Sequence, residues 1–195
     1  MTDNPSPVTV PRFKAATTTY SIHDRVVYPG HGVAEITNIL EKSIGQCSIK
    51  FYELKFLNKD MTVLVPLHNL PSVGIRPLSS SERVHMVFEA LARPARKISP
   101  YELTASNWNK RNKEYQTKIR KGDLNDLSEI YRDLKNIAQQ KELSFGEKNL
   151  LHQTEHLLVE EIALIERVNE ERAIELLRSM ISQGFANKQA QHVSE

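Results

Sequence analysis

The chain has 195 residues, of which 39% are hydrophobic and 26% charged, and its formal net charge is +2. These proportions are near the average of globular proteins and argue against a wholly disordered chain, and the length allows one large domain or two small ones. No run of about eighteen uncharged apolar residues is present and the first residues lack an apolar centre, so we expect a cytoplasmic protein without a membrane span or a signal peptide.

The N-terminal third combines a polar start with a β-rich segment. Residues 1–19 include three prolines and a TTT run, and we expect them to form a flexible tail. Residues 20–78 contain short β-rich runs separated by turn residues such as those of Pro29-Gly30-His31-Gly32. The expected strands are Arg25–Tyr28, Val33–Leu40, Cys47–Phe56, Met61–Val65 and Val73–Arg76. Five short strands in about sixty residues predict an SH3-like or Tudor-like β-barrel.

Residues 79–184 have a helical period instead. Capping boxes at Ser79/Glu82 and at Ser144/Glu147 start two helices, and Asn107 is a good N-cap for another. The expected helices cover about 79–93, 108–121, 124–140, 144–165 and 169–184, the last ending at Gly184. The sequence thus predicts a two-domain α+β protein in which the barrel precedes a bundle of about five α-helices. We expect residues 185–195 to form a second flexible tail.

Positive charge is concentrated in one short segment. Between residues 93 and 121, nine Lys or Arg face two Asp or Glu, which gives +7 in a chain whose total is +2. A dense local patch of this kind is typical of a contact with a polyanion such as DNA.

The only tryptophan, Trp108, lies at the start of the helix that contains most of this charge, and two interpretations are open. In the first, Trp108, Tyr115 and Ile119 share one face of the helix and form its buried stripe. In the second, Trp108 is exposed and wedges against a DNA base step, while Lys110, Arg111 and neighbouring cations hold phosphates. The free N–H groups of the helix start would then favour a phosphate as well.

Two motifs hint at chemistry. His152-Gln-Thr-Glu155-His156 matches the H-x-x-E-H pattern of zinc peptidases, in which two histidines hold the metal and the glutamate handles the proton of the water. Both histidines, however, point away from the apolar stripe of their helix. Gly30-His31-Gly32 lacks the third glycine of a nucleotide-binding loop and is better explained as a tight turn. The single cysteine, Cys47, completes no disulfide or cysteine-based zinc site, and we expect no cofactor.

Several separated motifs resemble the CarD/CdnL family of bacterial transcription regulators. The first segment contains Arg25-Val-Val-Tyr-Pro-Gly-His-Gly32, Leu54-Lys55, Met61-Thr-Val-Leu-Val-Pro66 and Val73-Gly-Ile-Arg76. The helical segment contains Asn107-Trp-Asn-Lys-Arg111, Gly122-Asp123, Arg132-Asp-Leu134 and Leu143-Ser-Phe-Gly-Glu-Lys148. Several motifs in the right order are much harder to meet by chance than any one of them.

This resemblance implies a Tudor-like domain over 20–78 that binds the β subunit of RNA polymerase, and a helical domain over 79–184 that contacts promoter DNA. The family's polymerase-contacting positions match Lys42 and Leu64, with Ile44 close by, and Leu64 stands where the family has a basic residue. The family's tryptophan wedge at the upstream fork of the promoter bubble matches Trp108. Its basic neighbours match Lys110, Arg111 and Lys113.

The resemblance therefore favours the wedge over the buried stripe, and a regulator over an enzyme. We expect a monomeric, nucleoid-associated adaptor that binds RNA polymerase and promoter DNA together and stabilises the open complex during initiation. Two alternatives remain: a zinc-dependent peptidase that uses His152, Glu155 and His156, and a protein-only interaction module whose basic helix merely adds solubility.

Overall fold

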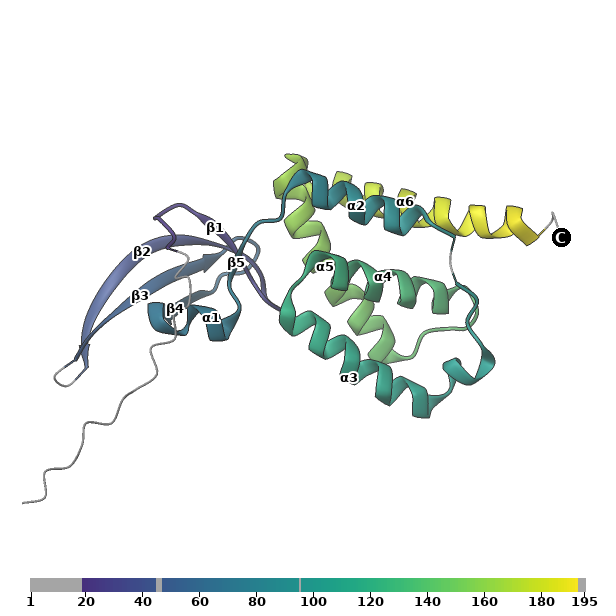
Figure 1. Cartoon of the computed structure of the whole chain (residues 1–195), viewed down its shortest axis with the longest axis horizontal. Helices are drawn as coiled ribbons and strands as arrows, with labels where there is room; N and C mark the ends of the chain where they lie inside the picture. Colours follow the sequence, from purple (N-terminus) through teal and green to yellow (C-terminus); the bar gives the residue numbers. More distant parts are fainter. Residues whose placement is uncertain (1–18, 45–46, 95, 193–195) are drawn as a thin grey trace, which may run out of the picture.

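The computed structural model describes residues 19–44, 47–94 and 96–192, and Figure 1 shows two parts lying side by side. A five-stranded antiparallel sheet forms the N-terminal part, and a helical bundle follows it. The predicted two-domain α+β layout is confirmed. The expected tail, apart from Thr19, lies outside the described residues. No helix among the described residues is both long and apolar enough to cross a membrane.

The sheet has the strand order β4-β3-β2-β1-β5. Its strands are β1 (Arg25–Tyr28), β2 (Gly32–Ile44), β3 (Cys47–Phe56), β4 (Thr62–Pro66) and β5 (Arg76–Pro77). The β2–β3 hairpin is the longest element of the sheet and extends away from the helices (Figure 1). The register of this hairpin shifts between Ile36 and Asn38, where a bulge bends β2.

One predicted strand is wrong. We expected Val73–Arg76 to be extended, but Leu70–Val73 forms the short helix α1, preceded by the 3-10 turn η1 (Leu67–Asn69). Pro71 suits the first turn of a helix because its missing N–H has no partner there, and Gly74 ends α1 in the left-handed conformation with φ = 78°. Only Arg76–Pro77 remains extended and pairs with β1.

Among the described residues, α1 and β5 are followed by five more α-helices and a second 3-10 turn. After α1 come α2 (Ser81–Ala92), η2 (Pro100–Leu103), α3 (Ala105–Lys121), α4 (Leu124–Ala138), α5 (Phe145–Glu166) and α6 (Glu170–His192). The five helices from α2 through α6 share one apolar core. Within this bundle α2 lies along α6 (Figure 1). A separate apolar core lies within the sheet. The two domains thus have a core each.

The helix starts differ from the prediction at two places. Ser80, not Ser79, caps α2, because its side chain accepts the N–H of Arg83. The N-cap of α3 is Thr104, three residues before the predicted Asn107. The predicted capping box of α5 is confirmed: Ser144 Oγ accepts the N–H of Glu147, and the glutamate accepts the N–H of Ser144.

The last helix does not end at Gly184. It continues to His192, so most of the segment expected to be a C-terminal tail is helical. Gly184 is buried against the end of α2, and a methyl group in place of its hydrogen would stand 2.5 Å from the carbonyl oxygen of Leu91. Glycine therefore allows α6 to lie close to α2 at this point instead of ending the helix.

A tight turn of the sheet domain fits into the helical domain. The turn Pro29–Gly32 contains two glycines with positive φ, as its sequence predicts. Gly122, which ends α3 with φ = 64°, lies against Pro29, and a methyl group on Gly122 would stand 3.0 Å from Cα of that proline. Glycine is required at position 122 for two reasons: the left-handed backbone conformation and the close approach of Pro29.

An arginine and a buried glutamate complete this joint. The guanidinium of Arg76 donates to both carboxylate oxygens of Glu161 on α5 at 2.7 Å each. The same guanidinium donates to the carbonyl oxygen of Gly122 at 2.6 and 2.9 Å, and the N–H of Ser79 donates to Glu161 at 2.9 Å. A paired, hydrogen-bonded charge of this kind fixes geometry, so the two domains have a defined relative position.

Candidate functional site

Trp108 lies in the first turn of α3, with its indole at the edge of the bundle. Its backbone N–H donates to the carbonyl oxygen of Thr104 at 3.1 Å, so it is not one of the free N–H groups that we expected at this residue. The indole is partly buried and packs against the core of the helical domain. The structure thus combines features of both interpretations: the Trp108 side chain packs against the core, but the residue is only partly buried.

Arg111 lies differently from the expectation. Its side chain is only 12% exposed, and it donates to the carbonyl oxygen of Glu102 and, at 3.3 Å, to Oε1 of Glu147. The guanidinium carbon is 6.0 Å from the centre of the Trp108 ring. Arg111 is therefore not on the surface where a phosphate contact was expected. It braces the indole from inside the bundle through charge and ring contact.

Glu147 is the fixed anion that holds Arg111 in place. It is 1% exposed and accepts Nζ of Lys141 at 2.7 Å and the N–H of Ser144 at 2.9 Å. Burial alone would raise the pKa of this carboxyl, but the hydrogen bonds from Lys141 and Ser144 outweigh burial and lower it. Glu147 therefore stays ionised at neutral pH and keeps its partners around the indole.

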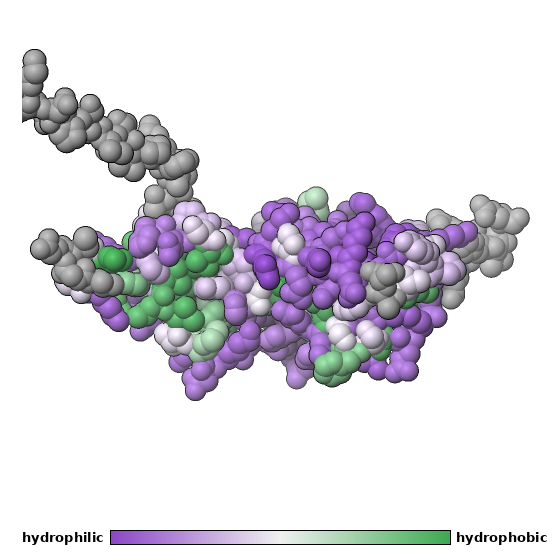
Figure 2. Space-filling view, turned by 90° about the horizontal axis from the view of Figure 1, so that it is seen from below, coloured by the Kyte–Doolittle hydropathy of each residue, from purple (hydrophilic) through white to green (hydrophobic). Residues whose placement is uncertain are grey.

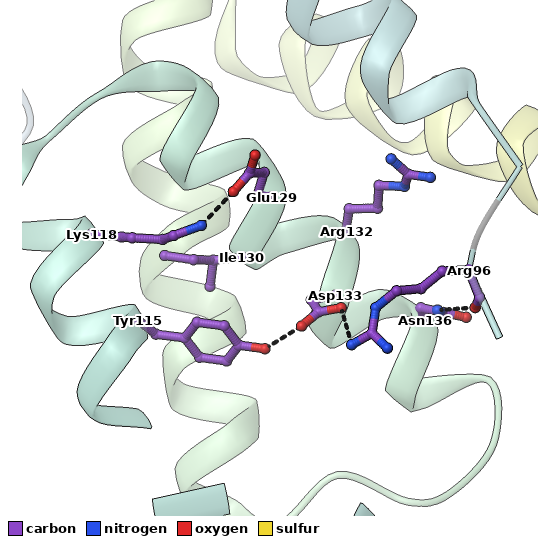
Figure 3. Close-up of a pocket in the computed structure, with 8 residues that line it drawn as sticks. All are labelled: Arg96, Tyr115, Lys118, Glu129, Ile130, Arg132, Asp133 and Asn136. Atoms are coloured by element: carbon purple, nitrogen blue, oxygen red, sulfur yellow. Dashed lines mark hydrogen bonds and ion pairs between the residues drawn. The ribbon is translucent and has the colours of Figure 1, made fainter. Parts of the chain in front are cut away.

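A second polar network fixes the approach to α3. Figure 3 shows Tyr115 of α3 reaching Asp133 of α4, while Arg96 approaches the same carboxylate from the segment before η2. The Tyr115 hydroxyl donates to Asp133 at 2.6 Å, and Arg96 donates to Asp133 at 3.2 Å and to Glu102 at 2.6 Å. Burial, then the charge of Asp133, raises the pKa of Tyr115, which therefore remains a neutral donor.

Three residues of this network, Arg96, Tyr115 and Asp133, line a hollow of about 310 Å³ between α3 and α4, and Glu102 binds Arg96 beside it. Hydrogen bonds from Ser99 and Arg96 lower the pKa of Glu102 to about 2, so its carboxylate stays charged across the physiological range. Because the cations and carboxylates that line the hollow bind each other, we interpret it as part of the scaffold and not as a ligand site. It holds η2 and the N-terminal half of α3 in position, and with them Trp108.

Lys110 and Lys113 are exposed, in agreement with the expectation. At 100° per residue, however, they lie about 160° and 140° around α3 from Trp108, on the side that faces away from the bundle. Arg120 and Lys121 are exposed on this same side. We call Lys110, Lys113, Arg120 and Lys121 the cationic stripe. The sequence-based list of contacts missed its last two members, although their helical spacing was visible in the sequence.

The sheet brings two of the predicted polymerase-contacting residues to one face. Residues directly opposite one another in a ladder point to the same side, as do alternate residues of one strand. Asn38 is opposite Glu53, which is opposite Leu64, and Lys42 is opposite Ile49. Lys42 and Leu64 therefore share a face. Ile44 pairs with Cys47 at the end of the hairpin, and its side chain lies outside the described part of the structure.

Apolar side chains lie between these two residues. Leu40 is opposite Phe51, which is opposite Pro66, and these pairs lie between Leu64 and Lys42 on the same face. We call Leu40, Lys42, Ile49, Phe51 and Leu64 the outer sheet face. All five are partly or fully exposed and none belongs to the apolar core of the sheet. The sequence analysis missed Leu40, Ile49 and Phe51, although alternation along the two strands marks them.

The two domains differ in surface character. In the view of Figure 2, apolar surface gathers over the N-terminal domain, whereas the helical domain is mostly hydrophilic. Leu64 is 37% exposed, so it leaves apolar area available at the position where the resemblance led us to expect a cation. An apolar contact is consistent with this surface, and an ion pair through Leu64 is not possible.

The histidine motif on α5 lies apart from these surfaces. His152 is exposed, and Glu155 accepts the Tyr131 hydroxyl at 2.9 Å while Arg178 and Lys135 approach it. Glu155 is thus engaged by three neighbours. Among the described residues, no cluster of three or more His, Cys, Asp or Glu side chains has an arrangement that would hold a metal ion.

Two family models match most of the chain. The CarD-like/TRCF RID domain matches residues 20–79, and the CarD C-terminal domain matches residues 87–178. The Bacillus subtilis (strain 168) protein named "Putative transcription factor YdeB" is 26% identical over 154 residues, which cover 78% of this chain and 96% of that protein. The solved N-terminal domain of Myxococcus xanthus CarD, a 72-residue solution NMR structure, is 28% identical and covers 29% of this chain and 76% of its own, with a TM-score of 0.26. Both halves match in the right order, and the chain belongs to the CarD/CdnL family of transcription regulators, with an RNA polymerase-interacting domain at its N-terminal end.

Proposed function

We propose that the protein is a monomeric adaptor that binds the β subunit of RNA polymerase through the outer sheet face and promoter DNA through the helical domain. It acts in the cytoplasm, at the nucleoid, and requires no cofactor. At the promoter it contacts the upstream fork of the transcription bubble with Trp108 and favours the open complex over the closed one. Lys42, Ile44 and Leu64 belong to the polymerase contact, and Lys110 and Lys113 to the DNA contact.

The observation that supports this proposal best is the position of the indole. Trp108 packs against the bundle yet is only partly buried, and the guanidinium of Arg111, which pairs with Glu147, lies near its ring. A ring held in this way needs little ordering when it enters a distorted base step, and an opened junction offers a better fit than intact duplex. A difference in affinity between the two DNA states shifts the equilibrium towards opening by that difference.

The cationic stripe supports the DNA contact from the other side of α3. A helix with its side chains is about 10–12 Å across, so the indole on one side and the lysines on the other reach different parts of one duplex end. The lysines would then neutralise phosphates independently of the DNA sequence, while the indole would bind an opened base step more tightly than a stacked one.

The joint between the domains couples the two contacts. Arg76, Glu161 and the turn Pro29–Gly32 fix the sheet relative to α3 and α5. When the outer sheet face binds polymerase, Trp108 is held at a defined distance from it, which raises its effective concentration at the fork. Two weak contacts in one rigid chain thereby act as one strong contact.

The DNA contact is tested with Trp108→Ala. Because the indole is only partly buried, we expect the variant to fold, to lose stimulation of open-complex formation, and to bind forked promoter DNA more weakly. Open-complex lifetime on a promoter template and circular dichroism during heating measure these effects. Met86→Ala, at a 61% exposed position on α2, is the matched control. A variant that forms open complexes as well as the parent would refute the wedge, and one that unfolds would show that Trp108 is a core residue.

The polymerase contact is tested separately with Leu64→Glu in the full chain. A carboxylate at this exposed position on an apolar face should abolish capture of RNA polymerase and leave binding to forked DNA unchanged. Met86→Glu serves as the control for an added charge. Undiminished polymerase capture by the Leu64 variant would remove the outer sheet face from the proposal. If the parent protein shows no salt-dependent binding to forked DNA, a protein-only interaction module is favoured instead.

A further inference from the structure

Phe145 is the most exposed large apolar side chain among the described residues, with 80% of its surface in solvent. It is the first residue of α5, directly after the N-cap Ser144. Leu143, two residues earlier, is buried in a small apolar cluster with Ile98 and Ile137. Phe145 does not join this cluster and is exposed instead. Because the core does not use this ring, its apolar area remains available for a partner.

Gly146, the residue directly after Phe145, relates the position of Phe145 to that of Trp108. Gly146 lies beside the Trp108 indole, since a methyl group on Gly146 would stand 3.3 Å from Cζ2 and 3.8 Å from Cε2 and Nε1. Glu147, one residue further, holds Arg111, which approaches the same indole. Phe145 is therefore the immediate sequence neighbour of a residue that touches the indole, and two aromatic rings meet solvent at the same end of the bundle.

We infer that Phe145 is a second DNA-contacting ring, which stacks on an unpaired base at the fork beside the step that Trp108 enters. This inference rests on the proposed function and adds a ligand class to it: single-stranded bases next to a duplex end. Nucleic acid is favoured as the ligand because α3 presents Trp108 on one side and the cationic stripe on the other, so one duplex end can reach both. Stacking on an aromatic ring is independent of base identity, since every base has a π-face.

The two rings have different tasks. Trp108 packs against the core and lies beside Gly146 and Arg111, which suits a rigid wedge in the duplex. Phe145 has no comparable brace among the contacts described, which suits a ring that adapts to a base already free of its partner. The two rings together would thus bind a junction with unpaired bases more tightly than a distorted but fully paired duplex. An open promoter contains such a junction and a closed promoter does not.

The inference is tested with the full-length protein and no polymerase. The probe is a forked DNA with 2-aminopurine at the first unpaired position of one strand, compared with a fully paired duplex of the same sequence. Phe145→Ala should weaken binding to the fork roughly 5- to 100-fold, and leave binding to the duplex unchanged. Phe145→Trp should restore binding and the change in 2-aminopurine fluorescence, and Phe145→Leu, which keeps apolar area without a π-face, should restore neither.

The outcomes separate this inference from the proposed function. If Trp108→Ala weakens fork binding and Phe145→Ala does not, Phe145 does not contact DNA, whereas the proposed contact of Trp108 with DNA is supported. Equal rescue by leucine and tryptophan would overturn stacking. If the parent protein shows no preference for the fork, both the inference and the DNA contact fall. In a separate capture assay with RNA polymerase, weaker capture by Phe145→Ala together with unchanged DNA binding would assign Phe145 to a protein partner and would also overturn the inference.

Discussion

The indole of Trp108 lies against Gly146 at the start of α5, and a β-carbon on that glycine would stand 3.3 Å from Cζ2 of the ring. This contact is tighter than most ordinary carbon contacts, so one of the two residues would have to move if Gly146 gained a side chain. The glycine thus lets an aromatic ring from α3 rest on the first turn of another helix. Its small size helps to determine how far the ring reaches into solvent.

Gly146→Ala tests this relationship. Alanine should stabilise α5 by up to about 1 kcal/mol through helix propensity, but the added methyl group displaces the indole. We expect little net gain in the melting temperature and a shift of the fluorescence maximum, which reports on Trp108 because the chain has one tryptophan. Fork binding should weaken severalfold. Asn149→Ala, at an exposed position on the same helix, should leave the emission unchanged. Unaltered emission of the Gly146 variant would contradict the close contact.

Arg111 should contribute more to the stability of the fold than to DNA binding. Arg111→Ala removes a cation from the buried Glu147 carboxylate, and we expect a loss of about 3 kcal/mol in the free energy of unfolding. Urea unfolding measures this loss. Lys110→Ala, one residue away but exposed, should change stability by less than about 0.5 kcal/mol. Equal stability of the two variants would show that the Arg111–Glu147 pair contributes nothing.

The stripe should govern the salt dependence of DNA binding. The double variant Lys110→Glu with Lys113→Glu should bind DNA more weakly at every salt concentration, and the slope of log K against log salt should become less steep by up to about 2. Polymerase capture should not change. Fluorescence anisotropy over a salt titration gives the slope. A slope equal to that of the parent protein would exclude both lysines from phosphate contact.

Arg76 should couple the two domains. In Arg76→Ala, Glu161 stays buried without its guanidinium partner, which should cost about 3–5 kcal/mol and separate the unfolding of the two domains. Arg83→Ala, which breaks an exposed pair with Asp123, should cost less than about 1 kcal/mol. Scanning calorimetry distinguishes one transition from two. A single, unshifted transition in Arg76→Ala would show that this ion pair does not couple the domains.

Glu160 should make stability depend on pH. Burial at the joint, only partly offset by the N–H of Val33, raises the pKa of this carboxyl to about 7. Lys59 lowers the pKa as well, and Glu170 and Glu161 raise it. Because the folded state holds the proton more tightly than the unfolded one, this contribution to stability is complete below about pH 4.5 and is lost as the pH rises through 7.

Glu160→Gln, which cannot ionise, should therefore lose less stability than the parent protein between pH 5 and 8, by at most roughly 3 kcal/mol. Urea unfolding at a series of pH values measures the difference. Glu175→Gln, at an exposed position on α6, should follow the parent curve. Parallel curves for the Glu160 variant and the parent would show that the carboxyl titrates normally.

Local patterns in the sequence were sufficient for much of the fold. Short β-rich runs between turn residues predicted β1 and β3 with their observed bounds, and the helical period together with the Ser144/Glu147 capping box predicted the start of α5. These features depend on contacts within a few residues, which a sequence displays directly. The fifth strand failed for the same reason: β-branched residues suggested a strand, while the turn preferences of Pro71 and Gly74 prevailed.

Composition and motif order alone determined that a β-domain precedes a basic helical domain, and they placed the charge and the single tryptophan on one helix. Only the tertiary structure decided which of these side chains are available. It put Arg111 inside against Glu147, left Lys110 and Lys113 outside, and brought Gly146 to the Trp108 ring from 38 residues away in the sequence. Exposure and pairing depend on which distant segments pack together, and that is decided by the sum of many contacts rather than by any local pattern.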